Sequence, residues 1–186
     1  MLIRQERAQD AAAIDAVLLD AFGEWGASVV DLVANLRSAG LFIPELMVVA
    51  EQSLNVVGFA GVSRVRVEGP MDSFQALNLS PLAVATAFQG KGIGKALIEG
   101  VLERLRDHPE PILFLEGDPG PRSLYRKYFT PLSDRLVAPD EELEPGAFQM
   151  RALSTYNANV HRGKVVYPQP FRDLATGDGT EEPASA

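Results

Sequence analysis

The sequence contains no cysteine and only two histidines among its 186 residues. The absence of cysteine excludes disulfide scaffolds, iron–sulfur clusters, zinc ribbons and thiol catalysis. His108 and His161 alone leave little from which to build a histidine metal site or a Ser-His-Asp triad. We therefore expect a functional site that uses neither a metal ion nor a thiol nucleophile.

Basic residues are also scarce, because 17 Lys and Arg stand against 25 Asp and Glu, a formal net charge of −8. Nucleic-acid affinity rests on neutralising phosphates, so this balance argues against a nucleic-acid partner. The longest nearly uncharged window is 73–98, in which two lysines are the only charged residues. It contains Asn78, Pro81 and three glycines, so it cannot cross a bilayer as a helix. Met1–Arg4 runs into charged residues without the apolar core of a signal peptide. We expect a soluble, cytoplasmic protein.

Apolar residues make up 46% of the chain, and this length suits one domain with a sizeable core. Helical spacing of apolar side chains predicts one helix after Asp10, a second from Ser28 to Gly40 and a third after Gly94. A short helix is expected over 121–128. Runs of β-forming residues predict strands at 46–51, 56–67, 74–86, 112–115 and 148–153.

The order of these elements predicts an antiparallel meander followed by a strand–helix–strand crossover. A crossover of this kind joins parallel strands, so the sheet is expected to be mixed and the fold to be α/β. Residues 173–186 are rich in Gly, Glu and Ala and show no periodicity. We therefore predict a single domain over residues 1–172 and a disordered acidic tail over 173–186.

The most informative segment is the glycine-rich stretch 89–96, which lies between a predicted strand and an amphipathic helix. Glycines at the start of a helix let several N–H groups converge where the helix dipole favours negative charge. Lys91 and Lys95 add positive charge, and the window 73–98 contains no Asp or Glu. The stretch therefore predicts a site for an anionic group such as a phosphate.

Two common phosphate-binding motifs do not fit this stretch. A P-loop would need glycine where Gln89 stands and a hydroxyl residue where Ala96 stands. A dinucleotide-binding fingerprint would need its third glycine at Lys95 or at Leu97. The site is therefore expected to hold its anion in another way.

The pattern that does fit is Gln-x-x-Gly-x-Gly, at Gln89, Gly92 and Gly94. In this pattern, together with the strand before it, the helix after it and the later segments 115–119 and 124–129 in the same order, the sequence resembles the GNAT superfamily of acetyl-CoA-dependent N-acetyltransferases. The resemblance extends from residue 1 to about 171, and over this range the sequence looks like the YhbS-like branch of that family. It implies an α/β (α+β) fold with a mixed, centrally splayed sheet of about six or seven strands flanked by about four helices.

The resemblance also implies how a cofactor is held. The backbone amides of the motif would hold the pyrophosphate of coenzyme A, the main chain from Leu82 to Val84 would pair with the pantetheine arm like an added strand, and the N–H of Val84 would face the thioester carbonyl. The cofactor-binding residues expected on this basis are Leu82, Ala83, Val84, Gln89, Gly90, Lys91, Gly92, Ile93, Gly94 and Lys95.

For catalysis, the resemblance implies that Tyr125 is the general acid that protonates the leaving thiolate, with Tyr128 as a competitor for the role. A phenol with a pKa near 10 can protonate a thiolate whose pKa is about 8.5. No general base is assigned, although two carboxylates at a strand end beside the loop are better placed than the others. The carboxylates considered are Glu24, Glu45, Asp72, Glu116 and Asp118, of which Glu116 and Asp118 are the better placed.

The resemblance therefore implies an enzyme, an acyltransferase that moves the acetyl group of acetyl-CoA to a primary amine by direct attack. The acceptor would be a small-molecule or peptide amine, and no metal, nucleic acid or membrane partner is expected for this monomer or homodimer. The family often has Gly-Phe after its Tyr-bearing helix, where this chain has Tyr128 and Phe129. This departure keeps open a non-catalytic acyl-CoA-binding regulatory module, and a third alternative is a structural or interaction protein that kept only the fold.

Overall fold

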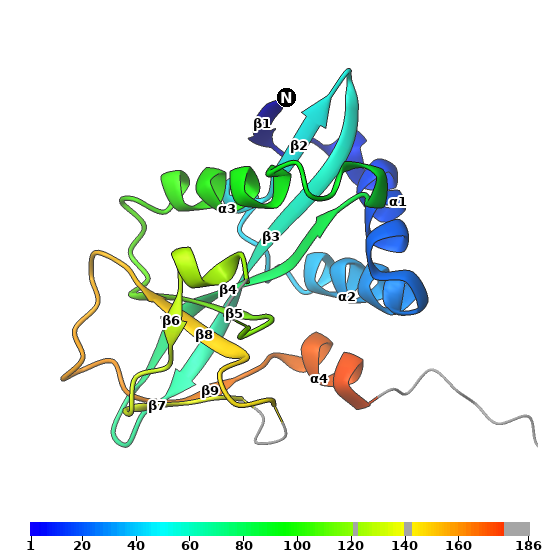
Figure 1. Cartoon of the computed structure of the whole chain (residues 1–186). Helices are drawn as coiled ribbons and strands as arrows, with labels where there is room; N and C mark the ends of the chain where they lie inside the picture. The colour runs from blue at the N-terminus through cyan, green and yellow to red at the C-terminus, as the bar shows by residue number, and fades with distance from the viewer. Residues whose placement is uncertain (121–122, 140–142, 177–186) are drawn as a thin grey trace, which may run out of the picture.

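The computed structural model of the chain describes residues 1–120, 123–139 and 143–176 (Figure 1). Within these ranges, nine strands form one sheet in the order β1-β2-β3-β4-β5-β8-β6, and β9 pairs with both β3 and β7 beside that path. The strands are β1 (Leu2–Gln5), β2 (Val48–Gln52), β3 (Asn55–Glu68), β4 (Ser73–Val84), β5 (Ile112–Glu116), β6 (Thr130–Pro131), β7 (Leu136–Val137), β8 (Phe148–Ala152) and β9 (Gly163–Val166).

Helices cover both faces of this sheet (Figure 1). The α-helices are α1 (Ala11–Phe22), α2 (Gly26–Ser38), α3 (Ile93–Arg104) and α4 (Gln169–Thr176), and short 3₁₀ turns include η4 (Thr86–Phe88) and η5 (Tyr125–Lys127). On β2, Val48 and Ala50 belong to the core that packs against α3, while Val49 belongs to the core that packs against α1 and α2. Because consecutive side chains of a strand point to opposite faces, α3 lies on one face and α1 and α2 lie on the other.

The sheet opens between β4 and β5, which run parallel to each other. Their register pairs Leu77 with Leu113 and Asn78 with Phe114, after which β4 continues to Val84 while β5 ends at Glu116. On its other side β4 stays paired with β3 to its last residue. The described part of β4 beyond Asn78 therefore presents one edge to a gap in the sheet, which is the splay that the family resemblance implies.

The fold class expected from the sequence is confirmed: the sheet is mixed, splayed and flanked by four α-helices. The sheet contains nine strands instead of six or seven because it includes the two-residue strands β6 and β7 and the strand β9. The predicted helices after Asp10 and Gly94 and the five predicted strands are all present, with ends that differ by a few residues.

Two predicted segments need correction. The second helix begins at Gly26, not at Ser28, because a Cβ at residue 26 would lie 2.7 Å from Leu19 Cα, so only glycine lets α2 start this close to α1. Over 121–128 the structure has the 3₁₀ turn η5, and residues 121 and 122 lie outside the described residues.

The predicted disordered tail over 173–186 is also wrong at its start. Residues 173–176 form the last turn of α4, which begins at Gln169. The helix was missed because only Phe171 and Leu174 mark its apolar face, too few positions for a periodicity to appear. Residues 177–186 lie outside the described residues.

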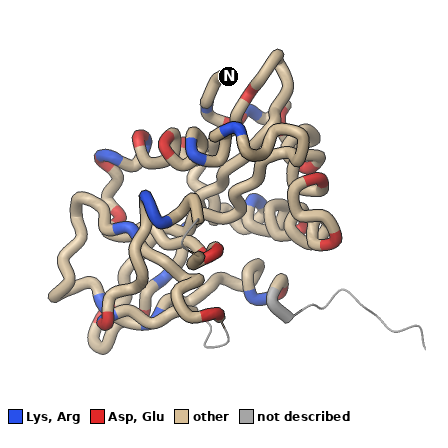
Figure 2. The backbone as a smooth tube through the Cα atoms, in the orientation of Figure 1, with Lys and Arg blue, Asp and Glu red and all other residues tan. Residues whose placement is uncertain are grey.

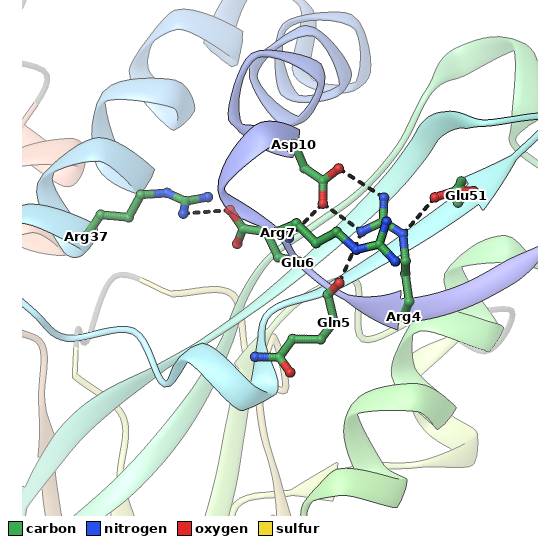
Figure 3. A network of polar contacts seen from close by, with 7 residues as sticks. All are labelled: Arg4, Gln5, Glu6, Arg7, Asp10, Arg37 and Glu51. Carbon is green, nitrogen blue, oxygen red and sulfur yellow. Dashed lines mark hydrogen bonds and ion pairs between the residues drawn. The ribbon is translucent and has the colours of Figure 1, made fainter.

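A polar network fixes the start of α1 to the edge of the sheet (Figure 3). The Arg4 guanidinium donates to both carboxylate oxygens of Asp10, at 2.6 and 2.9 Å, and to Glu51 at 2.7 Å. Asp10 also accepts a hydrogen bond from the Arg7 N–H. Hydrogen bonding to Arg4 lowers the pKa of the Asp10 carboxyl, so this buried acid is charged at neutral pH. The network therefore holds β1, β2 and the first turn of α1 in one arrangement.

Candidate functional site

The glycine-rich stretch forms the turn between β4 and α3, and its geometry leaves several N–H groups pointing out of the helix start. Gly92 is the N-cap of α3 with φ 80°, and Gly90 has φ 71°, both in the left-handed region that favours glycine. The first helical hydrogen bond runs from Ala96 N–H to Gly92 O at 3.0 Å. The N–H groups of Ile93, Gly94 and Lys95 precede that bond and have no helical acceptor. They are therefore available to an anion.

The space in front of these N–H groups is open. A Cβ added at Gly90 or Gly92 would meet nothing within 4 Å, whereas one at Gly94 would lie 3.2 Å from Leu124 Cδ2. A cavity of about 380 Å³, which we call the motif cavity, occupies this space. Its described lining residues are Leu82, Val84, Phe88, Gln89, Gly90, Gly92, Ile93, Gly94, Lys95 and Leu124.

Two of the residues expected from the sequence lie beside the motif cavity without lining it. The Lys91 Nζ donates to the Ala87 carbonyl at 2.8 Å and lies 5.2 Å from the centre of the Phe88 ring. Ala83 is buried in the core with α1 and α2 and pairs with Phe59 of β3. Figure 2 shows that the loop and the first turn of α3 carry basic residues while acidic residues lie further along the helix. The charge near the cavity is thus positive, as the sequence predicts.

The end of β4 turns main-chain groups toward the opening of the sheet. The Ala85 N–H donates to Val57 O on β3 at 2.9 Å. Because N–H groups alternate in direction along a strand, the N–H groups of Val84 and Leu82 point the other way, away from β3 and toward the gap. The Gln89 side chain donates to Val84 O at 2.9 Å and so ties the motif to the strand end. The first residue of the motif therefore positions the edge that faces the gap.

Sequence reasoning missed Asp20, which fastens the same loop from α1. Its carboxylate accepts a hydrogen bond from the Thr86 N–H at 2.6 Å, and its carbonyl accepts one from the Thr86 hydroxyl at 3.2 Å. The two residues are 66 positions apart in the chain, and Asp20 lies on the exposed side of an amphipathic helix. No local pattern marks such a contact, so only the three-dimensional structure could reveal it.

Tyr125 lies at the gap between β4 and β5. Its ring packs so closely on the end of β5 that a Cβ at Gly117 would fall 2.3 Å from the Tyr125 Cε2. Burial raises the pKa of the Tyr125 phenol, and the nearby Asp118 carboxylate raises it further. The hydroxyl therefore carries its proton at neutral pH.

Tyr128, the competitor for this role, faces a different part of the molecule. Its hydroxyl donates to Glu99 Oε1 on α3 at 2.7 Å, and burial together with this acid raises the pKa of Tyr128 to about 12. Among the described residues, Tyr125 lines a cavity at the gap and Tyr128 lines neither of the two cavities there. The arrangement favours Tyr125 as the tyrosine that can reach a reacting group.

A second and larger cavity of about 600 Å³, which we call the apolar cavity, lies on the other side of the gap. Leu82 lines both cavities, so they meet at the exposed edge of β4. The described residues that line the apolar cavity are Phe22, Val29, Leu32, Leu79, Ser80, Pro81, Leu82, Leu115, Glu116, Tyr125, Pro139, Leu143, Lys164, Val165, Val166, Tyr167, Phe171, Arg172 and Leu174.

The structure places the five candidate bases in different surroundings. Of the five carboxylates considered, Glu116 lines the apolar cavity, where it lies beside the Tyr167 hydroxyl. Burial raises the pKa of Tyr167, and the Glu116 carboxylate raises it further. Asp118 instead accepts a hydrogen bond from the Gly120 N–H at 2.6 Å. Among the residues described here, the remaining three lie on the surface away from both cavities; they are Glu24, Glu45 and Asp72.

Among the described residues, no helix has the length and apolar character needed to cross a lipid bilayer.

Comparison with protein families matches residues 38–136 to a family described as "Acetyltransferase (GNAT) domain". The chain is 31% identical over 175 residues to "Uncharacterized N-acetyltransferase YhbS" of Escherichia coli K12, which covers 92% of this chain and 98% of that protein. It is 37% identical over 97 residues to "Uncharacterized N-acetyltransferase YjhQ" of the same strain, covering 52% of each chain.

Two solved structures resemble this fold over nearly its whole length. The crystal structure of Escherichia coli YhbS in complex with CoA superposes with a TM-score of 0.80 at 29% identity, covering 92% of this chain and 91% of that one. The structure of a GNAT family acetyltransferase from Brucella melitensis in complex with acetyl-CoA gives a TM-score of 0.70 at 30% identity, covering 91% and 97%.

Proposed function

Because this chain belongs to the GNAT family of acetyltransferases, we propose that it transfers the acetyl group of acetyl-CoA to a primary amine by direct attack of the amine. The observation that carries the proposal is the gap between β4 and β5, where the motif cavity and the apolar cavity meet at Leu82. One cavity suits the donor and the other suits the acceptor. The complexes of the two similar structures with CoA and acetyl-CoA support the choice of donor.

The motif cavity fits the pyrophosphate of the donor. The N–H groups of Ile93, Gly94 and Lys95 converge at the positive end of α3, and a helix N-terminus is a ready-made anion site. The open space at Gly90 and Gly92 is the volume that a side chain would fill. The proposed cofactor-binding residues are Leu82, Ala83, Val84, Gln89, Gly90, Lys91, Gly92, Ile93, Gly94 and Lys95, with Ala83 and Lys91 acting from beside the cavity.

The exposed edge of β4 fits the extended arm of the donor. Leu82 and Val84 turn their N–H and C=O groups into the gap, so an extended chain can pair with them as an added strand would. The Val84 N–H then faces the thioester carbonyl and stabilises negative charge that develops on its oxygen. Gln89, bonded to the Val84 carbonyl, and Asp20, bonded to Thr86, hold this edge in place.

Acetyl-CoA supplies an activated acetyl thioester, and transfer forms a bond from the amine nitrogen to the acetyl carbon while the bond from that carbon to sulfur breaks. The amine gives up one proton to solvent, and the leaving sulfur takes one. Tyr125 donates the proton to the sulfur and recovers one from solvent. The raised pKa of its phenol ensures that the proton is present at neutral pH.

Binding and turnover measurements test the proposal directly. Isothermal titration with acetyl-CoA should show one site per chain, and adding an amine should release free CoA, followed with a thiol-reactive dye. The protein has no cysteine, so the dye reports released CoA alone. Tight binding with no amine-dependent release across a broad panel would favour the non-catalytic acyl-CoA-binding module. Failure to bind acetyl-CoA would contradict both functions.

A further inference from the structure

The apolar cavity has the size and lining of a small-molecule site. Its volume of about 600 Å³ falls within the usual range for ligand pockets, about 300–1,000 Å³. Its walls come from six helices and strands, which are α1, α2, α4, β4, β5 and β9, and most of the described side chains that line it are hydrocarbon. They include Phe22 of α1, Val29 and Leu32 of α2, Leu79 of β4, and Phe171 and Leu174 of α4.

Several polar groups of this cavity gather around the end of β5, and the cationic residues Lys164 of β9 and Arg172 of α4 also line it. Glu116 is the last residue of that strand, the Tyr125 ring packs on Gly117 next to it, and the Tyr167 hydroxyl lies beside the Glu116 carboxylate. Leu82, which borders the motif cavity, also lines this cavity. A molecule that occupies the cavity thus meets acceptor and donor groups near the exposed edge of β4, and elsewhere it meets mostly apolar walls with the two cationic residues Lys164 and Arg172.

The wall formed by α4 is part of the packed structure. The rings of Tyr167 and Phe171 stack with their centres 4.8 Å apart, and Tyr167 also meets Phe148 of β8 edge-on at 6.0 Å. Phe171 is 7% exposed, and α4 packs against α2. Figure 1 shows α4 beside α2, on the side of the sheet away from α3. The C-terminal helix therefore closes one side of the cavity and limits what fits there.

We propose that the acceptor is a primary amine carried on an apolar body, which places its nitrogen near Glu116 and fills the space between α1, α2 and α4. This inference rests on the proposed acetyl transfer. An apolar body gains free energy from leaving water for such walls, and the gain grows with each buried CH₂ group. A second ammonium placed among hydrocarbon side chains would lose its hydration without a partner. The cavity therefore selects against polyamines even though the whole chain is acidic.

The test compares primary amines in the CoA-release assay. Hexylamine and 2-phenylethylamine present an apolar body, whereas ethanolamine and putrescine present a short polar one and a second ammonium. We expect kcat/KM for the apolar amines to exceed that for the polar amines by at least about tenfold. Transfer that favours putrescine or ethanolamine would overturn the acceptor class and leave the acetyl transfer standing. No transfer to any amine would overturn the proposed function as well.

Variants of two opposite walls locate the effect. Phe171→Ala on α4 and Phe22→Ala on α1 should each lower kcat/KM for hexylamine about tenfold and leave that for ethanolamine within about twofold. Gln169→Ala, an exposed position on the same helix, is the matched control and should change neither value. Circular dichroism and the acetyl-CoA affinity report folding. Equal losses for both amines in folded variants would overturn the inference.

Glu116→Gln tests the amine end of the acceptor independently of its apolar body. The amine end is common to every acceptor, so this variant should raise KM for hexylamine and ethanolamine by a similar factor, about fivefold or more. A change confined to one of the two amines would contradict the placement of the nitrogen near Glu116.

Discussion

The two cavities at the gap in the sheet are built in different ways. Apart from Leu124, the motif cavity is lined by one continuous stretch from Leu82 to Lys95, where glycine conformation and strand direction set the geometry. The apolar cavity depends on side chains from six helices and strands spread between Phe22 and Leu174. A site of main-chain groups tolerates changes in side chains, whereas a site of side chains changes its preference with each substitution. The donor side should therefore fail through backbone changes and the acceptor side through changes in shape.

The largest expected effect is the loss of the donor site in Gly92→Glu. Glutamate at φ 80° strains the backbone and places a negative charge where the N–H groups of α3 converge, so acetyl-CoA affinity should fall by at least about 1,000-fold. Gly40→Glu is the matched control, because Gly40 also has positive φ and open space but lies at the end of α2. Titration calorimetry gives the affinities. Unchanged affinity in Gly92→Glu would mean that acetyl-CoA does not bind in the motif cavity.

The second effect concerns the chemistry where the cavities meet. Tyr125→Phe should lower kcat about 100-fold and leave the dissociation constant of acetyl-CoA within about threefold, because the hydroxyl acts on the leaving sulfur and not in binding. Tyr128→Phe is the matched control, since it removes a hydroxyl bonded to Glu99 outside both cavities. Steady-state kinetics and titration measure the two quantities. Equal losses of turnover and affinity in Tyr125→Phe would contradict its role as the acid.

The smallest effect should come from Asp20→Ala, which leaves both cavities lined as before. Losing the hydrogen bond from the Thr86 N–H to the Asp20 carboxylate loosens the loop before α3, although the backbone carbonyl of residue 20 still accepts from the Thr86 hydroxyl. Acetyl-CoA affinity should therefore fall about fivefold through a faster dissociation rate. Asp15→Ala on the same helix is the control. Stopped-flow dissociation checks the expectation. If acetyl-CoA dissociates from the two variants at the same rate, Asp20 has no part in holding the main-chain site.

The sequence predicted the lining of the motif cavity better than that of the apolar cavity, for a physical reason. The motif at Gln89, Gly92 and Gly94 is short and local, and the positive φ of Gly92 is a backbone conformation that favours glycine. The wall made by α4 was predicted to be partly tail, because two apolar residues do not make a visible period. Asp20 carried no signal either, since its contact joins segments that only the folded sheet brings together.

The start of α2 shows the same limit within the fold. A cap at Ser28 was a sound local prediction, but the helix begins at Gly26 because α1 passes so close to it. Such close approaches depend on how two helices cross, which no single stretch of sequence encodes.

Leu82 lines both cavities, whose other lining residues differ. This arrangement bears on whether the two substrates are bound at the same time during catalysis. Direct attack of the amine on the thioester requires both substrates to be bound before the acetyl group moves. With no cysteine in the chain, there is no thiol to store that group between two half-reactions. Plots of reciprocal initial rate against reciprocal acetyl-CoA concentration, taken at several amine concentrations, should therefore intersect, whereas parallel lines would mean a covalent intermediate on the protein.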